Sequence, residues 1–438
     1  MANPYLPFWE YVPDGEPRVF GDRVYVYGSH DRADSEFFCD HKLKVWSASV
    51  DRLDEWTCHG DIFHSEDDRD HPSDVDWTDA YLYAPDVVEK DGRYYLYAYL
   101  VDAKGCVAVS DRPEGPFKLL SRYEYNIPDH YDQGTFIDPG VLVDDDGRVY
   151  IYCGYQGSYM CELDPDTMYR VLDGTYQEDI IPREEPFAFF EACSPRKIGD
   201  TYYLIYSPQR GSRLAYATSE SPTGPFTYRG YIVDNGVDYP GGNNHGSICQ
   251  IKGQWYIFYH RMTNGTIMSR RGCVERIEIL PDGTIPTVEM TSLGFETALN
   301  PYRITPADTA CVLKGGCFIT ELDTFTRVIT NITSDCVMGW KYYDFGEDNS
   351  QGSMELEIKV IPRGCHGTIH VYIDEIGEET EIGTVEFDRS CSLLRSATSL
   401  VTGRHAVYLL AEAGYTGWAK DSFMQRPLFD LEALVFRK

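Results

Sequence analysis

Hydrophobic and polar residues alternate in short runs along most of the chain, and aromatic side chains occupy many of the hydrophobic positions. Alternation with a period of two is the pattern of a strand with one buried face. No long segment repeats apolar residues at the i, i+3, i+4 and i+7 spacing of an amphipathic helix. The pattern therefore predicts an all-β protein.

One short motif recurs five times in the first three hundred residues, and it consists of a turn glycine followed by an aromatic-rich alternating run. The copies begin at Gly21, Gly92, Gly147, Gly199 and Gly253, so their starts lie 71, 55, 52 and 54 residues apart. A period near 50 residues with several short strands per period is typical of a β-propeller with four-stranded blades. Five copies predict a five-bladed β-propeller.

The residues that precede each copy by one hairpin should line the central channel of such a propeller. One ionisable residue stands there in every repeat, next to proline or a small residue: Glu16, Asp86, Asp138, Glu191 and His245. Surface charges would not keep phase with a structural repeat, and burying several carboxylates around one axis costs free energy through desolvation and repulsion. The pattern indicates a functional site. The structural alternative is that these residues cap strand ends or bind backbone groups.

The repeat stops after Pro286, and a new set of short strands begins near residue 307. We expect a propeller domain over residues 1–290, a linker or crossing segment over 291–306 and a second domain over 307–438. Alternating runs at 318–322, 354–361, 368–373 and 405–411 are separated by turn signals. They predict a jelly-roll-like β-sandwich.

Composition and charge exclude some classes of partner. The chain has 39 Lys and Arg against 70 Asp and Glu, a net charge of −31, which argues against nucleic acids and anionic membranes because both require basic surface. The N-terminus lacks the basic start and apolar run of a secretion signal, so we expect a cytoplasmic protein. The 13 cysteines are odd in number and lack zinc spacing, so we expect free thiols in a reducing compartment.

Several carboxylates that face one pocket suit glycoside hydrolysis. One carboxyl must stay protonated to donate to the leaving oxygen, and another must be ionised to activate water or to attack directly. The sequence has no Gly-x-Ser-x-Gly elbow, no phosphate-binding Gly-Lys-Ser/Thr loop and no His-Glu-x-x-His helix. We expect no organic cofactor.

Several longer motifs lie around these positions. They are Asn3-Pro4, Tyr25-Val-Tyr-Gly-Ser-His-Asp31, Tyr83-Ala-Pro-Asp86, Phe136-Ile-Asp-Pro139, Glu191-Ala192, Asn243-Asn-His-Gly-Ser-Ile248 and Tyr259-His-Arg261. Together they resemble glycoside hydrolase family 43, a family of five-bladed, inverting enzymes that act on arabinose- and xylose-containing polymers. The tail, with Thr402-Gly-Arg-His-Ala-Val-Tyr-Leu409 and Leu428-Phe-Asp-Leu-Glu432, resembles a family 6 carbohydrate-binding module.

The family resemblance implies the catalytic residues. Glu191 stands where the general acid stands, and Asp138 stands where a third carboxylate orients that acid and tunes its pKa. The family's general base is the Asp of an Ala-Asp-Pro motif, where this chain has Gly15-Glu16-Pro17. Glu16 is the favoured base, with Asp14 and the more distant Asp31 as alternatives.

The resemblance also implies contacts to substrate and to a metal ion. Arg261 and Arg271 resemble positions near the pocket that bind substrate hydroxyls, with ion pairs elsewhere as the alternative. Asp31 and Asp86 are further candidates for substrate contacts. His245 matches a channel histidine that helps to hold a hydrated calcium ion on the propeller axis. Because Ca²⁺ prefers oxygen ligands, a metal-free histidine held by hydrogen bonds is the alternative.

We therefore expect an inverting glycoside hydrolase that releases α-L-arabinofuranosyl groups from arabinoxylan-type oligosaccharides. A β-D-xylosidase, or an enzyme with both activities, is the alternative in the same class, since arabinofuranose and xylopyranose present similar hydroxyl patterns. A sugar-binding propeller with little turnover is the alternative in another class.

Overall fold

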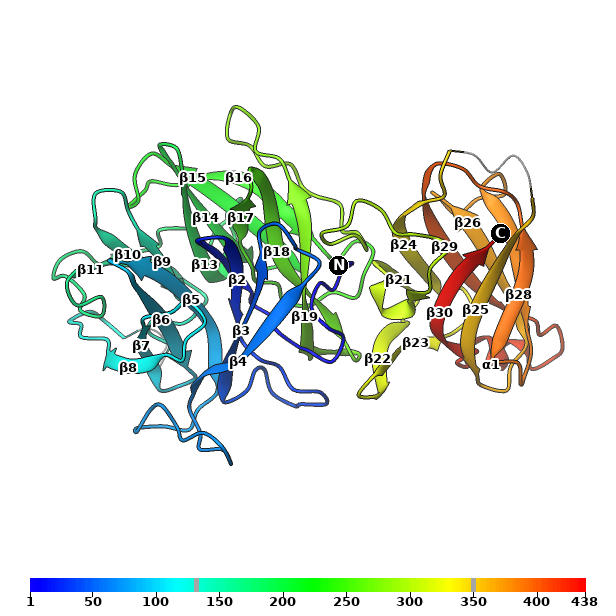
Figure 1. Cartoon of the computed structure of the whole chain (residues 1–438), viewed down its shortest axis with the longest axis horizontal. Helices are drawn as coiled ribbons and strands as arrows, with labels where there is room; N and C mark the ends of the chain where they lie inside the picture. Colours follow the sequence, from blue (N-terminus) through cyan, green and yellow to red (C-terminus); the bar gives the residue numbers. More distant parts are fainter. Residues whose placement is uncertain (130–133, 348–351) are drawn as a thin grey trace.

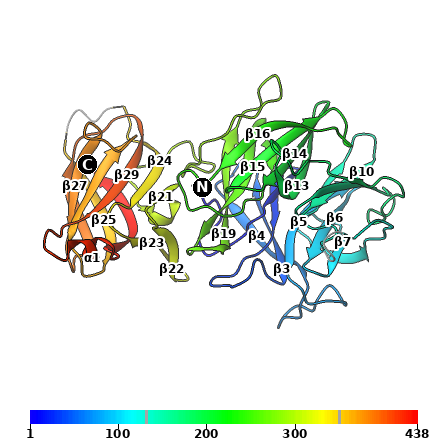
Figure 2. The same cartoon turned by 180° about the vertical axis from the view of Figure 1, so that it is seen from behind.

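The computed structural model describes residues 1–129, 134–347 and 352–438. Two β-rich units lie side by side in both views, the N-terminal unit in blue to green and the C-terminal unit in yellow to red (Figures 1 and 2). Within the described ranges, helix is limited to the short turns η1 (Ala307–Thr309) and α1 (Lys420–Met424). Neither is long and apolar enough to cross a membrane. The prediction of an all-β chain is confirmed.

Five antiparallel sheets form the N-terminal unit. Four of them have four strands: β1 (Glu16–Phe20), β2 (Arg23–Gly28), β3 (Lys42–Ser49) and β4 (Trp56–His64); β5 (Leu82–Lys90), β6 (Arg93–Leu100), β7 (Lys104–Ser110) and β8 (Lys118–Arg122); β9 (Gly140–Val143), β10 (Val149–Gly154), β11 (Ser158–Leu163) and β12 (Gln177–Glu178); β13 (Phe189–Ile198), β14 (Thr201–Pro208), β15 (Arg213–Ser219) and β16 (Thr227–Asp234). The fifth sheet has β17 (Ile248–Ile251), β18 (Gln254–Thr263) and β19 (Thr266–Ile277). Each sheet is a meander of consecutive strands, and the five sheets are the five predicted blades.

The predicted turn glycines join the first two strands of each blade. Between β5 and β6, Asp91 and Gly92 have φ values of 52° and 76°. Two consecutive residues in this region form the type I′ turn that matches the twist of a tight hairpin. The strand before each turn glycine is therefore the first strand of its blade, as the repeat predicts.

The first strands of the blades surround the propeller axis. β1 contacts β5 and β17, and β9 contacts β5 and β13. The circle is completed between β13 and β17, where Arg196 Nε donates to the Ile248 carbonyl at 2.9 Å. The N-terminal residues lie along β19, since Asn3 Nδ2 donates to the Val274 carbonyl and the Val274 N–H donates to Asn3 Oδ1, both at 2.9 Å.

The C-terminal unit is a sandwich of two antiparallel sheets. One sheet has β22 (Phe318–Asp323), β23 (Thr326–Ile332), β30 (Phe429–Arg437), β25 (Met354–Pro362) and β28 (Leu393–Thr398), with β20 (Thr305–Pro306) beside β30. The other has β21 (Val312–Lys314), β24 (Val337–Asp344), β29 (Arg404–Ala413), β26 (Gly367–Ile373) and β27 (Glu381–Phe387). β22, β25, β26 and β29 cover the four predicted runs, so the predicted β-sandwich is confirmed. The division at residues 290 and 307 stays a prediction.

The sandwich packs directly against the propeller. One hydrophobic core runs from Tyr239 and Ile285 of the propeller side to Trp340 and Phe436 of the sandwich. The Leu313 N–H donates to the Asp238 carbonyl at 2.8 Å across the contact. The two units therefore share buried apolar surface rather than meeting through a flexible linker.

Candidate active site

A cavity of about 490 Å³ opens at the end of the propeller axis where the first strands of the blades begin. Aromatic side chains form part of its wall: Phe38, Tyr83, Tyr99, Tyr155 and Phe190. Its polar side chains come from β13, from β19 and from the segments that lead into β1, β9 and β17, with the exposed Asp102 in addition: Asp14, Asp138, Glu191, Asn243, His245 and Arg270. Three of the predicted residues, Asp138, Glu191 and His245, are thus brought together.

Asp14 is buried and ionised at the cavity wall. Arg270 Nη1 donates to its Oδ1 at 2.9 Å, and the Ser29 hydroxyl donates to its Oδ2 at 2.8 Å. Burial acts to raise the pKa of Asp14, but the Arg270 guanidinium and the Ser29 hydroxyl contribute to an opposing effect that is larger, and the pKa lies below its usual value. Asp14 can therefore accept a proton but does not hold one at neutral pH.

Arg270 is the buried cation of the cavity, and it is held by a second carboxylate behind it. Its Nε and Nη2 each bind a carboxylate oxygen of Asp31 at 2.9 Å. Asp31 also accepts the Cys39 N–H at 3.1 Å and is fully buried. Asp31 is not among the residues that line the cavity. It positions Arg270, and the expected direct contact from Asp31 to substrate is not supported by this placement.

The pKa values of Asp138 and Glu191 are raised, in contrast to that of Asp14. Burial, with the negative charge of Asp14 in addition, raises the pKa of Glu191 to about 7. Burial and the neighbouring Glu191 and Asp14 carboxylates raise the pKa of Asp138 well above its usual value. Ionising all three carboxyls would cost free energy through desolvation and charge repulsion. The pair of Asp138 and Glu191 therefore retains a proton near neutral pH.

Glu16 lies outside the cavity, although the sequence analysis favours it as the base. Glu16 is the first residue of β1, whereas Asp14 stands in the turn before it with a φ of 55°, so the two side chains do not follow strand alternation. There it forms an ion pair with Arg196, lies 3.5 Å from Arg18 and accepts the Ser194 hydroxyl at 2.9 Å. Burial acts to raise the pKa of Glu16, but the two guanidinium groups outweigh it and the pKa is lowered.

Asp86 is also deeper than the cavity. Arg18 Nε and Nη2 bind its two carboxylate oxygens at 3.1 and 2.6 Å, and the Val141 N–H donates to it at 2.7 Å. Tyr83 and Ala84, earlier in the same strand, line the cavity, and Asp86 does not. The expected substrate contact of Asp86 is therefore replaced by a structural ion pair.

Arg261 and Arg271 face away from the cavity. They are paired residues on β18 and β19. Arg261 donates to the carbonyls of Ala310 and Thr291 at 3.0 and 2.8 Å. Arg271 donates to the Phe8 carbonyl at 2.8 Å and lies 3.4 Å from Glu321 of the sandwich. Successive side chains of a strand point to opposite faces, so Arg270 reaches the cavity and Arg271 supports the contact between the two units.

His245 lines the cavity, with its Nδ1 3.8 Å from Asp14 Oδ1. Burial lowers its pKa, so the imidazole is neutral near pH 7. Calcium requires six to eight oxygen ligands. Among the described residues, the one group of three or more His, Cys, Asp or Glu side chains with metal-ligand spacing does not include His245. The residues around His245 therefore do not fit a calcium ion held by protein ligands, and the predicted calcium stays a prediction.

Arg270 and the aromatic wall are the functional residues that the sequence analysis missed. Tyr83 and Asn243 lie inside motifs that were recognised, but the motifs do not show which side chains face the cavity. Strand alternation is the signal that separates Arg270 from Arg271. It requires knowledge of how β19 pairs with β18, and that pairing shifts register between Met262 and Thr263.

Comparisons with known proteins identify the family of the chain. Residues 10–285 match the family model described as Glycosyl hydrolases family 43. The chain is 39% identical over 465 residues to a xylosidase/arabinosidase of Thermoclostridium stercorarium, and the alignment covers 93% of this chain and 95% of that protein.

Two solved structures extend the comparison. A family 43 arabinoxylan arabinofuranohydrolase of Bacillus subtilis, in complex with cellotetraose, covers 100% of this chain and 97% of its own, with a TM-score of 0.53 and 23% identity, which shows the fold of both units. A family 43 β-xylosidase/α-arabinofuranosidase from a compost microbial metagenome, in complex with xylotriose in a calcium-free form, covers 66% of this chain and 97% of its own, with a TM-score of 0.52 and 29% identity. Since the family model spans well over half of the chain, this protein belongs to glycosyl hydrolase family 43.

Proposed function

We propose that this enzyme hydrolyses terminal or branching pentose units, releasing α-L-arabinofuranosyl groups from arabinoxylan-type oligosaccharides by inversion. Release of β-D-xylosyl groups is the alternative, and the name of the Thermoclostridium relative includes both activities. The observation that carries the proposal is the group of three buried carboxyls in one cavity, of which Asp14 is ionised while Asp138 and Glu191 retain a proton.

Glu191 is the proposed general acid. A carboxyl whose pKa is about 7 carries its proton below pH 7, and it can give that proton to the leaving oxygen. Asp138 lies beside it as a second buried carboxyl that disfavours ionisation of the pair. Arg270 opposes this effect, which keeps the pKa of Glu191 near neutrality rather than far above it.

Asp14, and not Glu16, is the proposed general base. Its carboxylate lines the cavity and is ionised, whereas Glu16 is bound by two arginines and a serine below the cavity. Water bound against Asp14 loses a proton to that carboxylate while its oxygen forms the new bond to the anomeric carbon. The bond to the leaving oxygen breaks at the same time, and that oxygen takes the proton of Glu191.

The aromatic wall supports a sugar as the ligand. Tyr83, Tyr99 and Phe190 border the same cavity as the carboxyls, and ring faces pack well against the C–H faces of a sugar. The net charge of −31 would not repel a neutral oligosaccharide. The complex of the metagenome relative with xylotriose supports an oligosaccharide of pentose units.

The test is release of 4-nitrophenol from the α-L-arabinofuranoside and the β-D-xylopyranoside, compared between wild type, Glu191→Gln and the control Glu220→Gln, whose side chain is exposed. The same three proteins are assayed on arabinoxylan oligosaccharides, whose leaving oxygen needs the proton, and there we expect Glu191→Gln to lose about 10²–10⁴-fold in kcat and the control to match wild type. NMR of the first product formed should show the anomeric configuration opposite to that of the substrate.

If wild type hydrolyses neither aryl glycoside nor arabinoxylan oligosaccharides, the sugar-binding alternative is favoured instead. A first product with retained configuration would exclude inversion.

Three further expectations remain proposals. A family 6 carbohydrate-binding role for the sandwich is supported by its two-sheet architecture and by the motif around residues 402–409. Calcium near His245 is supported by the calcium-free form named for one relative, and no step of the proposed mechanism uses it. A cytoplasmic location is supported by the sequence features alone.

A further inference from the structure

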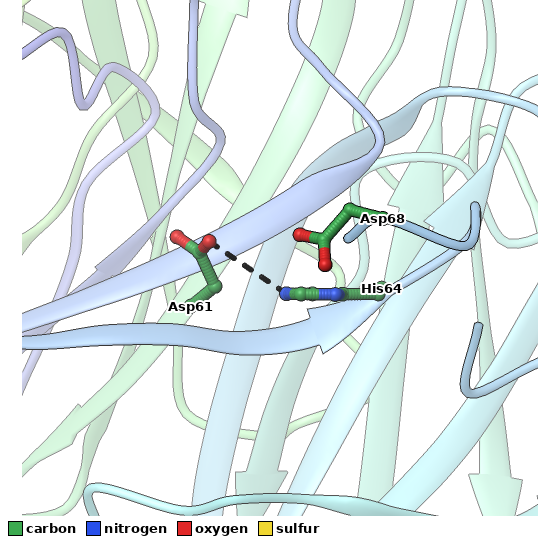
Figure 3. A group of neighbouring side chains, drawn as sticks. All are labelled: Asp61, His64 and Asp68. Atoms are coloured by element: carbon green, nitrogen blue, oxygen red, sulfur yellow. Dashed lines mark ion pairs between the residues drawn. The ribbon is translucent and has the colours of Figure 1, made fainter. Parts of the chain in front are cut away.

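A second group of ionisable side chains lies at the outer edge of the first blade, away from the cavity. Asp61 and His64 are in β4, the last strand of that blade, and Asp68 is in the segment that leads to the second blade. One ligand atom from each side chain lies within 4.8 Å of the other two. Both carboxylates face the imidazole ring of His64 (Figure 3).

His64 has a buried nitrogen that no neighbour satisfies. The residue is 4% exposed, and its Nε2 has no hydrogen-bond partner among the described residues. The closest carboxylate oxygen, Asp61 Oδ2, is 3.7 Å away, beyond hydrogen-bond distance. Buried polar atoms of native proteins are nearly always paired, so an unpaired imidazole nitrogen aimed at two carboxylates indicates a missing ligand.

The neighbouring backbone orients Asp68 for such a ligand. The N–H groups of Asp70 and His71 donate to its Oδ1 at 2.8 and 2.7 Å. This arrangement fixes the carboxylate plane and leaves Oδ2 available. The ring of His71 is 3.9 Å from the ring of His64, and its Nδ1 is 2.6 Å from the Pro72 carbonyl, so its Nε2 can remain an acceptor.

We propose that Asp61, His64 and Asp68 bind a divalent transition-metal cation of the zinc type, with water in the fourth position. One imidazole and two carboxylates are ligands that Zn²⁺ accepts at about 2.0–2.2 Å, and the present spacing needs only a modest contraction of the side chains. An imidazole ligand argues against Ca²⁺ and Mg²⁺, which select oxygen.

One cationic side chain lies beside the site. Lys42 Nζ lies 3.3 Å from Asp61 Oδ2 and balances part of the negative charge. Because the Lys42 side chain is 31% exposed, it can turn to solvent when a cation takes that oxygen.

The cation would connect two parts of the chain that lead to the active site. It would join the end of β4 to residues 65–81, the segment that enters β5. Tyr83 of β5 lines the cavity. The site is therefore a structural support for one wall of the cavity, independent of the catalytic carboxyls.

The experiment uses the full chain after removal of metals with a chelator. Zn²⁺ is titrated in competition with a chromophoric chelator against wild type, Asp68→Asn and Asp70→Asn. Asp68 is exposed, so its substitution leaves the fold intact, and Asp70 is an exposed control with the same charge change on the same segment. We expect one Zn²⁺ per chain in wild type and in Asp70→Asn, at least about tenfold weaker binding in Asp68→Asn, and a higher unfolding temperature with Zn²⁺ in the first two proteins.

Equal affinity in Asp68→Asn and wild type, or no competition with the chelator, would overturn the proposal. Co²⁺ provides a second readout, because its visible spectrum distinguishes nitrogen and oxygen ligands from thiolates. A thiolate charge-transfer band would assign the ion to a cysteine, such as the exposed Cys58, and would also overturn it. His64→Gln should abolish the Co²⁺ spectrum of the proposed site.

Discussion

Two layers of charge lie along the propeller axis, and they differ in how the charges are balanced. Apart from the exposed Asp102, the layer at the cavity has three carboxyl groups and one guanidinium: Asp14, Asp138, Glu191 and Arg270. The deeper layer has two carboxyl groups and two guanidinium groups: Glu16, Asp86, Arg18 and Arg196. β13 contributes to both layers through Glu191 and Arg196, and Asp14 directly precedes β1, which carries Glu16 and Arg18.

The comparison shows that burial alone does not produce a reactive carboxyl. In the deeper layer each carboxylate has its own arginine, and burial of Arg18 is outweighed by Asp86 and Glu16, which raise its pKa above the usual value. The pKa of Glu16 is lowered, whereas burial raises the pKa of Asp86 against the opposing effect of Arg18, and direct contacts fix all four groups. At the cavity the single Arg270 is shared between Asp14 and Asp31, so Asp138 and Glu191 keep a proton that can be donated.

The largest expected effect comes from Asp14→Asn. The asparagine keeps the size of the side chain but cannot take a proton from water, so we expect kcat to fall about 10²–10⁴-fold. The measurement is steady-state hydrolysis of both aryl glycosides at the pH optimum of wild type. Rescue of part of the lost rate by a small exogenous anion such as azide or formate would confirm that a base, rather than the fold, is missing.

Glu16→Gln should instead affect stability. It leaves Arg196 and Arg18 buried beside an uncharged amide, so we expect the free energy of unfolding to fall by about 2–4 kcal/mol. The kcat of the folded enzyme should stay within about threefold of wild type. Chemical denaturation and active-enzyme kinetics on the same preparation separate the two effects. A loss of kcat as large as that of Asp14→Asn would mean that Glu16 is the general base, and that the deeper layer takes part in catalysis.

The pH dependence of kcat/KM tests the excess of carboxyl groups over guanidinium groups at the cavity. Activity requires Glu191 protonated, so the rate should fall as the pH rises through about 7. Because the charge of Glu191 raises the pKa of Asp138, the two carboxyls hold one proton between them. Asp138→Asn removes one of the two sites for that proton, so the alkaline limb should move to lower pH by about one unit, which corresponds to roughly 1.4 kcal/mol. The control Asp173→Asn, an exposed substitution, should leave the limb in place. An unchanged limb in Asp138→Asn would mean that the two carboxyls do not share a proton.

Much of this architecture is readable from the sequence, because hydrophobic alternation and turn glycines are local signals. Glu191, Asp138 and His245 reach the cavity as their phase in the repeat predicts. Depth along the axis is not readable, because the sequence does not show where each first strand begins or where it is irregular. β1 begins at Glu16, so Asp14 stands at the cavity in the turn before it, and β5 shifts register between Tyr83 and Asp86.

The cluster of Asp61, His64 and Asp68 illustrates a second limit. Asp61 and His64 follow from one strand, but Asp68 joins them through a turn in an irregular segment, where no periodicity predicts which side chains meet. Contacts between strand ends and loops depend on the closed fold. Sequence pattern therefore predicts the scaffold better than the partners of individual side chains.

The smallest expected effect concerns Arg271, the arginine next to Arg270 on β19. Glu321→Gln removes the carboxylate that lies 3.4 Å from Arg271 and 3.1 Å from Arg327 at the contact between the two units. Because the Glu321 side chain is 21% exposed, we expect a loss of only about 1 kcal/mol in the free energy of unfolding, measured by denaturation against the exposed control Glu378→Gln. The KM for both aryl glycosides should not change, since Arg271 and the cavity lie on opposite faces of β19. An altered KM without a change in stability would mean that Arg271 contributes to substrate binding, and that strand alternation alone does not separate the two arginines.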